Sequence, residues 1–164
     1  MPTQYKFIKN FLSPIECDNF IGKLPLLDIN TAPAIDRENE EVPLDTWYRL
    51  ELLPTRIELN VSHTILSKIS KLLEKQVSAM DNRMYVIRYQ EGEFCVPHVD
   101  PTEKTIIIQL NSSYTGGDFV YNNEVIPMNK GDAVIFSNID SVHGVKMLTS
   151  GERYSLAMWL KDDI

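Results

Sequence analysis

The chain has 164 residues, of which 43% are hydrophobic and 24% charged, proportions that fit one globular domain and argue against a disordered or fibrous protein. Its formal net charge of -7, without any block of Lys or Arg, argues against a nucleic-acid partner, because phosphate binding is driven largely by basic side chains. Two distant cysteines, an N-terminal segment without an apolar signal core and the lack of a membrane-length apolar run predict a soluble, cytoplasmic protein without disulfides.

Two helices are predicted in the first half of the chain. The first covers Ser13–Leu24, where Ser13 and Glu16 can form a capping box at the N-terminus. The second covers about residues 62–78, where apolar residues recur at helical spacing. Its charged residues lie mostly opposite the apolar ones, so we expect this helix to cover one side of a sheet.

The segment between the helices is predicted to be irregular at first and then extended. Asn30–Asp45 contains two prolines and an acidic stretch, which indicate a long surface loop. This loop is a candidate for a lid or substrate-recognition element, and a solvated linker is the equally weighted alternative. Thr46–Leu52 alternates well enough to predict a strand.

From Met84 onward the pattern is that of short strands separated by turn residues, among them Gly116-Gly117 and Ser150-Gly151. A double-sheet jelly roll needs about eight such strands. We therefore expect an α+β, mainly β fold, with a jelly-roll core at 84–164 and helical support at 1–83 within one domain over 1–164. The predicted strands are Met84–Gln90, Phe94–Val99, Lys104–Asn111, Asp118–Tyr121, Glu124–Pro127, Asp132–Ser137, Val142–Leu148 and Glu152–Leu160.

The segment Pro97-His98-Val99-Asp100 is the first candidate for chemistry. Side chains at positions i and i+2 of a strand point to the same face, so His98 and Asp100 would converge on one point. An imidazole and a carboxylate side by side are two of the three ligands in the 2-His-1-carboxylate site of non-haem Fe(II) oxygenases. The pair alone is a weak signal, because a surface strand can also carry both residues.

His143 can supply the third ligand. It begins a late predicted strand, and strands that are distant in sequence face each other in a jelly roll. The other histidine, His63, lies in the second predicted helix and is expected to be an ordinary surface or cap residue.

Arg153 is the candidate for binding an anion. Strand alternation places it on one face with Ser155, Ala157 and Trp159. Arginine is rarely buried without a partner, and no carboxylate is evident in the neighbouring strands. A ligand carboxylate gripped by the guanidinium, with Ser155 as a further donor, is therefore one interpretation. An outward-facing arginine on a surface strand is the other.

Taken in order, these motifs resemble a known family. The stretch from about Met84 to Leu160 is similar to the prolyl 4-hydroxylase branch of the 2-oxoglutarate and Fe(II)-dependent oxygenases. The resemblance rests on Tyr89-x-x-Gly92, His98-x-Asp100, Leu110-Asn111, Gly116-Gly117, Gly131-Asp132-Ala133-x-x-Phe136, His143 and Arg153-x-Ser155-x-x-x-Trp159.

The resemblance implies a double-stranded β-helix in which His98, Asp100 and His143 bind iron. It also implies 2-oxoglutarate and oxygen as co-substrates, with ascorbate in the same set of cofactors. The implied reaction is hydroxylation of an unactivated C–H bond, in a peptidyl or free proline for the prolyl 4-hydroxylase branch. The residues implied at the co-substrate are Arg153, which would hold the 5-carboxylate, and Tyr89, Ser155 and Gln109, the last standing where some relatives have a tyrosine.

Several alternatives stay open at this point. The substrate could be another protein side chain or a small molecule, and the fold could be a cupin-like metal-binding jelly roll without 2-oxoglutarate chemistry. A nucleic-acid demethylase is disfavoured by the acidic charge, and a non-catalytic binding module gives no reason for the two histidines and the aspartate to converge. The sequence indicates no oligomeric state and no membrane partner. Tyr48, Arg88 and Trp159 are the residues expected to line a substrate pocket.

Overall fold

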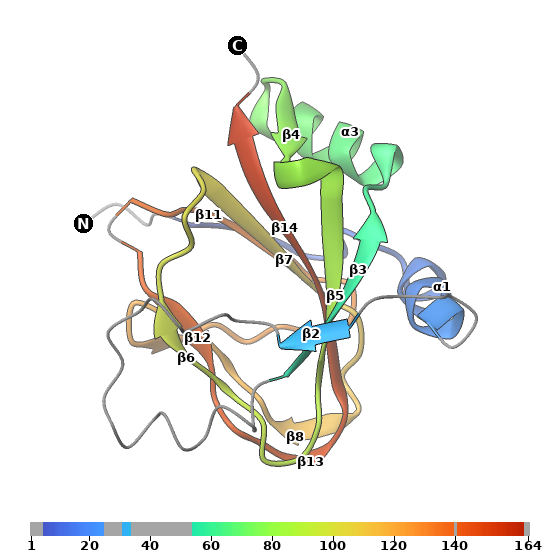
Figure 1. Cartoon of the computed structure of the whole chain (residues 1–164), viewed down its shortest axis with the longest axis vertical. Helices are drawn as coiled ribbons and strands as arrows, with labels where there is room; N and C mark the ends of the chain where they lie inside the picture. The colour runs from blue at the N-terminus through green and yellow to red at the C-terminus, as the bar shows by residue number, and fades with distance from the viewer. Residues whose placement is uncertain (1–4, 25–30, 34–53, 140, 163–164) are drawn as a thin grey trace.

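The computed structural model describes residues 5–24, 31–33, 54–139 and 141–162 (Figure 1). Among these residues no helix is long and apolar enough to cross a membrane. The elements are β1 (Tyr5–Ile8), α1 (Pro14–Lys23), β2 (Thr31–Pro33), β3 (Thr55–Asn60), α3 (His63–Leu73), β4 (Val77–Ala79), the 3-10 helix η3 (Met80–Asn82), β5 (Arg83–Tyr89), β6 (Cys95–His98), β7 (Lys104–Gln109), β8 (Tyr114–Gly116), β9 (Phe119–Tyr121), β10 (Glu124–Val125), β11 (Ala133–Ser137), β12 (His143–Val145), β13 (Leu148–Gly151) and β14 (Arg153–Asp162).

Two antiparallel sheets form the β-core. The larger sheet has the order β1-β11-β7-β14-β5-β3-β2, with β4 paired to the end of β14. The smaller sheet has the order β10-β9-β12-β6, and β8 pairs with β13 as a separate ribbon. Apolar side chains from both sheets share one buried cluster, for example Ile107 and Phe136 from the larger sheet and Phe119 and Val145 from the smaller. The predicted double-stranded β-helix is therefore confirmed.

The larger sheet is covered on both faces, which explains why its central strands β7 and β11 are almost continuously apolar. In β7, Ile106 and Ile108 point to one face and belong to a cluster that includes Ile65 and Ile69 of α3. Ile107 points to the other face and packs between the two sheets. The expectation that the N-terminal helices pack on one face of the β-core is thus confirmed (Figure 1).

The helix boundaries agree with the prediction at three of their four ends. Ser13 Oγ accepts a bond from the main-chain N–H of Glu16, and the Glu16 carboxylate accepts one from the N–H of Ser13, which is the predicted capping box. The end of the second helix was predicted wrongly at Ser78. The helix stops at Leu73, because Glu74 adopts a left-handed conformation with φ of 57° and residues 77–79 pair with β14 instead.

Two predicted turns are parts of strands. Gly116 lies in β8, and Ser150-Gly151 lies in β13, which pairs with β8. A Cβ on Gly116 would lie 2.5 Å from the main-chain oxygen of Met147, so this glycine permits a close approach of two backbones.

The predicted loop at 30–45 begins with a strand, since residues 31–33 form β2 and pair with β3. The rest of that loop and the predicted strand Thr46–Leu52 lie outside the described residues. The lid prediction therefore stays a prediction.

Candidate active site

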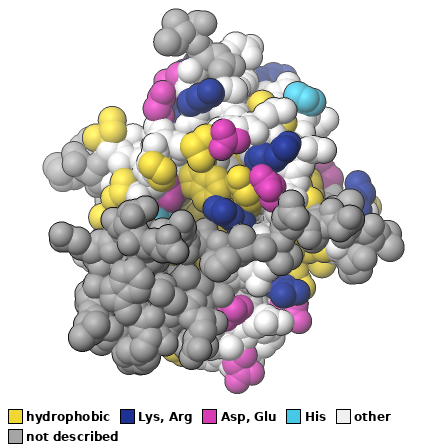
Figure 2. All heavy atoms as spheres, viewed as in Figure 1, with side chains coloured by type: hydrophobic (Ala, Val, Ile, Leu, Met, Phe, Trp, Pro, Cys, Tyr) yellow, Lys and Arg dark blue, Asp and Glu magenta, His cyan; other side chains and the backbone are white. Residues whose placement is uncertain are grey.

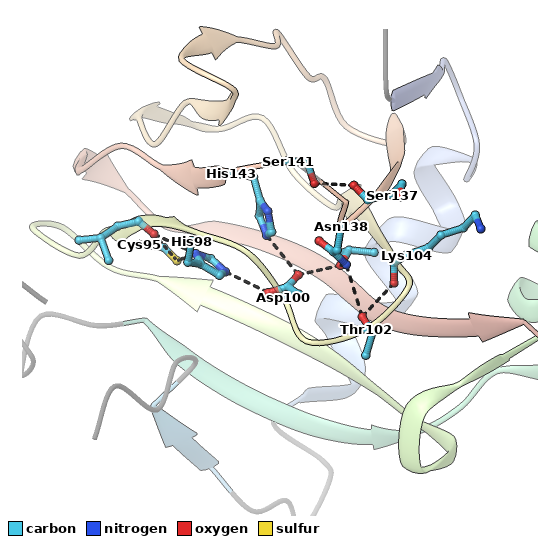
Figure 3. Close-up of polar contacts among 11 residues, drawn as sticks. Cys95, His98, Asp100, Thr102, Lys104, Ser137, Asn138, Ser141 and His143 are labelled. Atoms are coloured by element: carbon cyan, nitrogen blue, oxygen red, sulfur yellow. Dashed lines mark hydrogen bonds and ion pairs between the residues drawn. The ribbon is translucent and has the colours of Figure 1, made fainter. Parts of the chain in front are cut away.

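Two neighbouring strands of the smaller sheet bring the predicted metal ligands together. His98 at the end of β6 is the cross-strand partner of His143 at the start of β12, and Asp100 follows β6 directly. The backbones of β6 and β12 lie so close together here that a Cβ on Gly144 would be only 2.7 Å from the main-chain oxygen of Cys95. One ligand atom from each of the two histidines and the aspartate lies within 4.8 Å of the others. Figure 3 shows the two imidazoles pointing at the Asp100 carboxylate.

The three side chains of this cluster lie close enough together that they could hold one metal ion. His98 Nε2 lies 3.0 Å from Asp100 Oδ1, and His143 Nε2 lies 3.1 Å from Asp100 Oδ2. Asp100 and His143 are buried, and all three side chains line a cavity of about 250 Å³ between the sheets. Two imidazoles and one carboxylate that converge beside an open cavity form a donor set that fits non-haem Fe(II).

The same contacts shift the protonation equilibria of the cluster. Burial opposes ionisation of Asp100, but hydrogen bonds from His143 and His98 outweigh it and hold the pKa of the carboxyl well below its ordinary value. Burial also opposes protonation of His98, yet the Cys95 sulfur and the Asp100 carboxylate raise the pKa of this imidazole to about 10. The Asp100 carboxyl is therefore ionised and accepts hydrogen bonds from both imidazoles.

Hydrogen bonds from outside the cluster orient its ligands. His98 Nδ1 donates to the main-chain oxygen of Val96 at 2.8 Å, which leaves Nε2 as the nitrogen that faces Asp100. Thr105 Oγ1 donates to Asp100 Oδ2 at 2.7 Å, and Asn138 Nδ2 donates in turn to Thr105 Oγ1 at 3.0 Å. Sequence reasoning missed Thr105 and Asn138. Strand alternation could place Thr105 on the inner face of β7, but could not identify the carboxylate that it contacts.

Loss of the Thr105 hydroxyl is expected to weaken metal binding without unfolding the protein. Thr105→Val keeps the shape of the side chain and removes the donor to Asp100, so metal affinity should fall by roughly 10- to 100-fold. Thr105→Ser should restore most of it, since serine keeps the hydroxyl. Anaerobic calorimetric titration with Mn(II) measures the affinity, and Thr149→Val, which removes an exposed hydroxyl 2.9 Å from Thr115 Oγ1 on the β8–β13 ribbon, is the matched control. Wild-type affinity in Thr105→Val would show that Asp100 is oriented without this bond.

Arg153 lies on β14 with its side chain buried in the interior. It is 1% exposed, and its Nη1 donates to Ser155 Oγ at 3.3 Å. Its Cζ lies 5.1 Å from the centre of the Tyr89 ring, and Tyr89 itself lines the cavity. Among the described residues no acidic group pairs with Arg153, and its Nε has no hydrogen-bond partner. A buried guanidinium without an anion is costly, so the arrangement fits an anionic ligand such as a carboxylate.

Gln109 is placed differently from the other predicted co-substrate residues. It is fully buried, and its side-chain amide donates to the main-chain oxygens of Asn111 and Tyr154 at 3.1 and 3.2 Å. It is the cross-strand neighbour of Ser155, but neither residue lines the cavity. The geometry therefore gives Gln109 a contact with the backbone around β14, and its role toward a co-substrate stays a prediction.

The pocket residues predicted from the sequence are partly corrected. Trp159 lines the cavity as expected. Arg88 does not, because alternation along β5 places it on the same face as Met84 and Val86, which pack in the cluster beneath the helices. Tyr48 lies outside the described residues, whereas Arg56, which sequence reasoning missed, lines the cavity. His63 is exposed at the first position of α3, as expected.

Comparison with known proteins agrees with this geometry. Residues 84–161 match the family described as the 2OG-Fe(II) oxygenase superfamily. Prolyl 3-hydroxylase 1 of Gallus gallus is 28% identical over 159 residues, which are 87% of this chain and 21% of that protein, so the chain spans about a fifth of this relative.

Solved structures share the fold. An oxidoreductase of the 2OG-Fe(II) oxygenase family from Burkholderia pseudomallei has a TM-score of 0.70 at 14% identity, covering 96% of this chain and 84% of that one. The viral collagen prolyl hydroxylase of Paramecium Bursaria Chlorella virus-1, solved with 2OG, has a TM-score of 0.62 at 18% identity, covering 99% and 97%. The matched residues 84–161 cover most of the stretch from β5 to β14 and include all three converging side chains, and over this part the chain is similar to the 2OG-Fe(II) oxygenase superfamily.

Proposed function

We propose that the protein is a 2-oxoglutarate-dependent Fe(II) dioxygenase that hydroxylates an unactivated C–H bond of a peptidyl or free proline. One observation carries the proposal: two histidines and an aspartate converge on a cavity whose wall includes Tyr89, and a buried arginine that pairs with none of the described acidic groups packs against that tyrosine. A metal centre alone would not need the arginine. A cupin-like jelly roll that lacks 2-oxoglutarate chemistry is therefore the weaker alternative.

Each side chain has a role that follows from its position. His98, Asp100 and His143 would hold the iron at the wall of the cavity. Arg153 would bind the 5-carboxylate of 2-oxoglutarate, with Ser155 Oγ beside it. Bound iron, 2-oxoglutarate and oxygen together supply the oxidising chemistry. Apolar side chains such as Ile107 and Ala157 form the walls of the cavity and exclude water from it.

Proline as substrate is supported by the names of two similar proteins. One is called prolyl 3-hydroxylase and the other collagen prolyl hydroxylase. The sequence motifs resemble the prolyl 4-hydroxylase branch, so we propose C4 as the position of attack. A hydroxylase of another protein side chain or of a small molecule is the second candidate, because the ligands and the arginine do not depend on the substrate.

The proposal predicts hydroxyproline as product. Protein loaded anaerobically with Fe(II) and then given 2-oxoglutarate and oxygen should convert free L-proline or a proline-rich peptide to a product that has gained one oxygen. Mass spectrometry detects the gain, and amino-acid chromatography separates 3- from 4-hydroxyproline. Omission of ascorbate tests whether it is required. The control is the same protein without 2-oxoglutarate.

Two negative results have different meanings. If succinate forms but no proline probe gains an oxygen atom, the prolyl substrate is excluded and the oxygenase assignment stands. A protein that binds Fe(II) but consumes no 2-oxoglutarate under any condition would instead contradict the proposed co-substrate.

A further inference from the structure

Arg56 shares the cavity with the metal-binding cluster. It lies on β3, the neighbour of β5 in the larger sheet, and its cross-strand partner Ile87 also lines the cavity. Alternation along β3 turns Ile57 and Leu59 toward the helices, where they pack in the hydrophobic cluster, and turns Arg56 to the opposite face. The positively charged Arg56 side chain thus lines the same cavity as His98, Asp100 and His143.

Aromatic rings hold the Arg56 guanidinium in place. Its Cζ lies 4.8 Å from the centre of the Tyr85 ring and 6.0 Å from that of Trp159. The two rings themselves are in contact, with centres 4.8 Å apart and planes at 57°. Such cation–π contacts position a guanidinium and leave its N–H donors available, because a ring face accepts charge but takes no strong hydrogen bonds.

The described acidic side chains nearest to Arg56 already pair with other residues. Glu58, which shares a face of β3 with Arg56, lies 3.4 Å from Arg83 Nε. Asp100 is paired with the two histidines and with Thr105. Within the described ranges Arg56 therefore makes no ion pair, although it is partly buried.

The remaining walls of the cavity define what else a ligand must offer. These walls are mainly apolar. On the face of the molecule drawn in Figure 2, apolar side chains over β3, β5 and β14 are likewise bordered by basic and acidic ones. The cavity volume of about 250 Å³ is below the range of roughly 300–1,000 Å³ that is usual for ligand sites. A small apolar body with one anionic group matches these walls. The apolar lining residues include Met80, Ile87, Ile107, Ala157 and Trp159.

We propose that Arg56 binds the carboxylate of the substrate, so that the preferred substrate is a small apolar amino acid with a free carboxylate. This inference rests on the proposed hydroxylase function and narrows it to free proline or to a proline at the carboxyl end of a chain. Arginine binds a carboxylate through two charge-assisted hydrogen bonds, whereas the amide of an internal prolyl residue offers one neutral carbonyl oxygen. The end of the substrate that Arg56 holds is thus fixed, and the apolar body extends toward the metal-binding cluster.

Matched acids and amides test the proposal. The probes are L-proline with L-prolinamide, L-leucine with L-leucinamide, and acetylglycylproline with its amide; the last pair distinguishes a chain end from a free amino acid. Wild-type protein with Mn(II) and 2-oxoglutarate under nitrogen should bind the acid of at least one pair more tightly, in equilibrium dialysis, by roughly 10- to 150-fold. The aerobic Fe(II) protein should show the same preference in kcat/KM.

Arg56→Gln should abolish the preference for the acid, and Arg56→Lys should retain part of it, because lysine keeps the charge and loses the planar fork. Arg83→Gln is the matched control, since Arg83 pairs with Glu58 and does not line the cavity. Succinate formed in the absence of any substrate reports the metal and co-substrate sites separately and should not change in Arg83→Gln.

Equal binding of acids and amides in the wild type, or an unchanged preference in Arg56→Gln, would overturn the proposal while leaving the hydroxylase function in place. If the wild-type protein formed no succinate from 2-oxoglutarate, this result would instead contradict the hydroxylase function itself.

Discussion

Asp100→Ala is expected to eliminate hydroxylation and most metal binding. Asp100 is the anionic member of the cluster, and both imidazoles and the Thr105 hydroxyl contact its carboxylate. Removing it leaves two neutral ligands and takes away the charge that offsets the cation. The loss of affinity should exceed the roughly 10- to 100-fold that accompanies loss of a supporting partner. Anaerobic titration with Mn(II) and succinate formation with Fe(II) measure the two effects.

Two comparisons make the Asp100 result interpretable. His63→Ala removes an exposed histidine at the start of α3 and should leave metal binding and turnover unchanged. Thermal unfolding of Asp100→Ala without metal measures separately how much the fold is weakened, because the buried carboxylate also contacts both histidines and Thr105. If Asp100→Ala retained wild-type metal affinity and turnover, the metal site would have to lie elsewhere in the protein.

The convergence of His98, Asp100 and His143 could be predicted because it depends on local geometry and on the small number of histidines. His98 and Asp100 share a face through the two-residue period of an extended chain, which holds in any strand. The chain has three histidines, so few residues could complete the cluster. The inward direction of Arg153 follows from the same period once β14 is recognised. The jelly roll itself follows from the number of short strands and the turn residues between them.

The errors come from interactions between distant residues. The helical period of the apolar residues at 62–78 continues past Leu73, but pairing of β4 with β14 ends the helix earlier. Gly116 was predicted to be a turn residue, yet it marks the close pairing of β8 with β13. Whether a glycine permits a turn or a close contact is decided by the partner strand, which the local sequence does not specify.

Supporting residues were the hardest to predict for the same reason. Thr105 contacts Asp100 from β7, across the turn that joins β6 to β7, and Asn138, just after β11, contacts Thr105 from 33 residues away. Arg56 reaches the cavity because β3 joins the edge of β5, a pairing with no short-range signal. Side chains of these types occur on most protein surfaces, so their identity alone does not indicate a function.

Arg153→Met is expected to raise the 2-oxoglutarate requirement steeply while leaving metal affinity nearly unchanged. Methionine keeps the packing against the Tyr89 ring and beside Gly117 but removes the charge. Losing one partner of a desolvated charge pair costs about 2–5 kcal/mol, which is roughly 30-fold to several thousand-fold in affinity. Succinate formation across a 2-oxoglutarate titration measures the requirement, and Mn(II) titration measures the metal. Arg153→Ala should show the same loss and Arg153→Lys a smaller one, because lysine keeps the charge without the planar fork.

Thermal unfolding separates the loss of a binding group from damage to the fold. In the wild type with Mn(II), added 2-oxoglutarate should raise the unfolding temperature, because a ligand that binds only the native state stabilises it. In Arg153→Met that increase should vanish, whereas the ligand-free protein should unfold at a temperature no lower than the wild type, since no described acidic group loses a partner. An Arg153→Met protein with unaltered 2-oxoglutarate dependence would place the carboxylate anchor on another residue. A large fall in the ligand-free unfolding temperature would show that the guanidinium stabilises the β-core itself, through its bond to Ser155 and its contact with Tyr89.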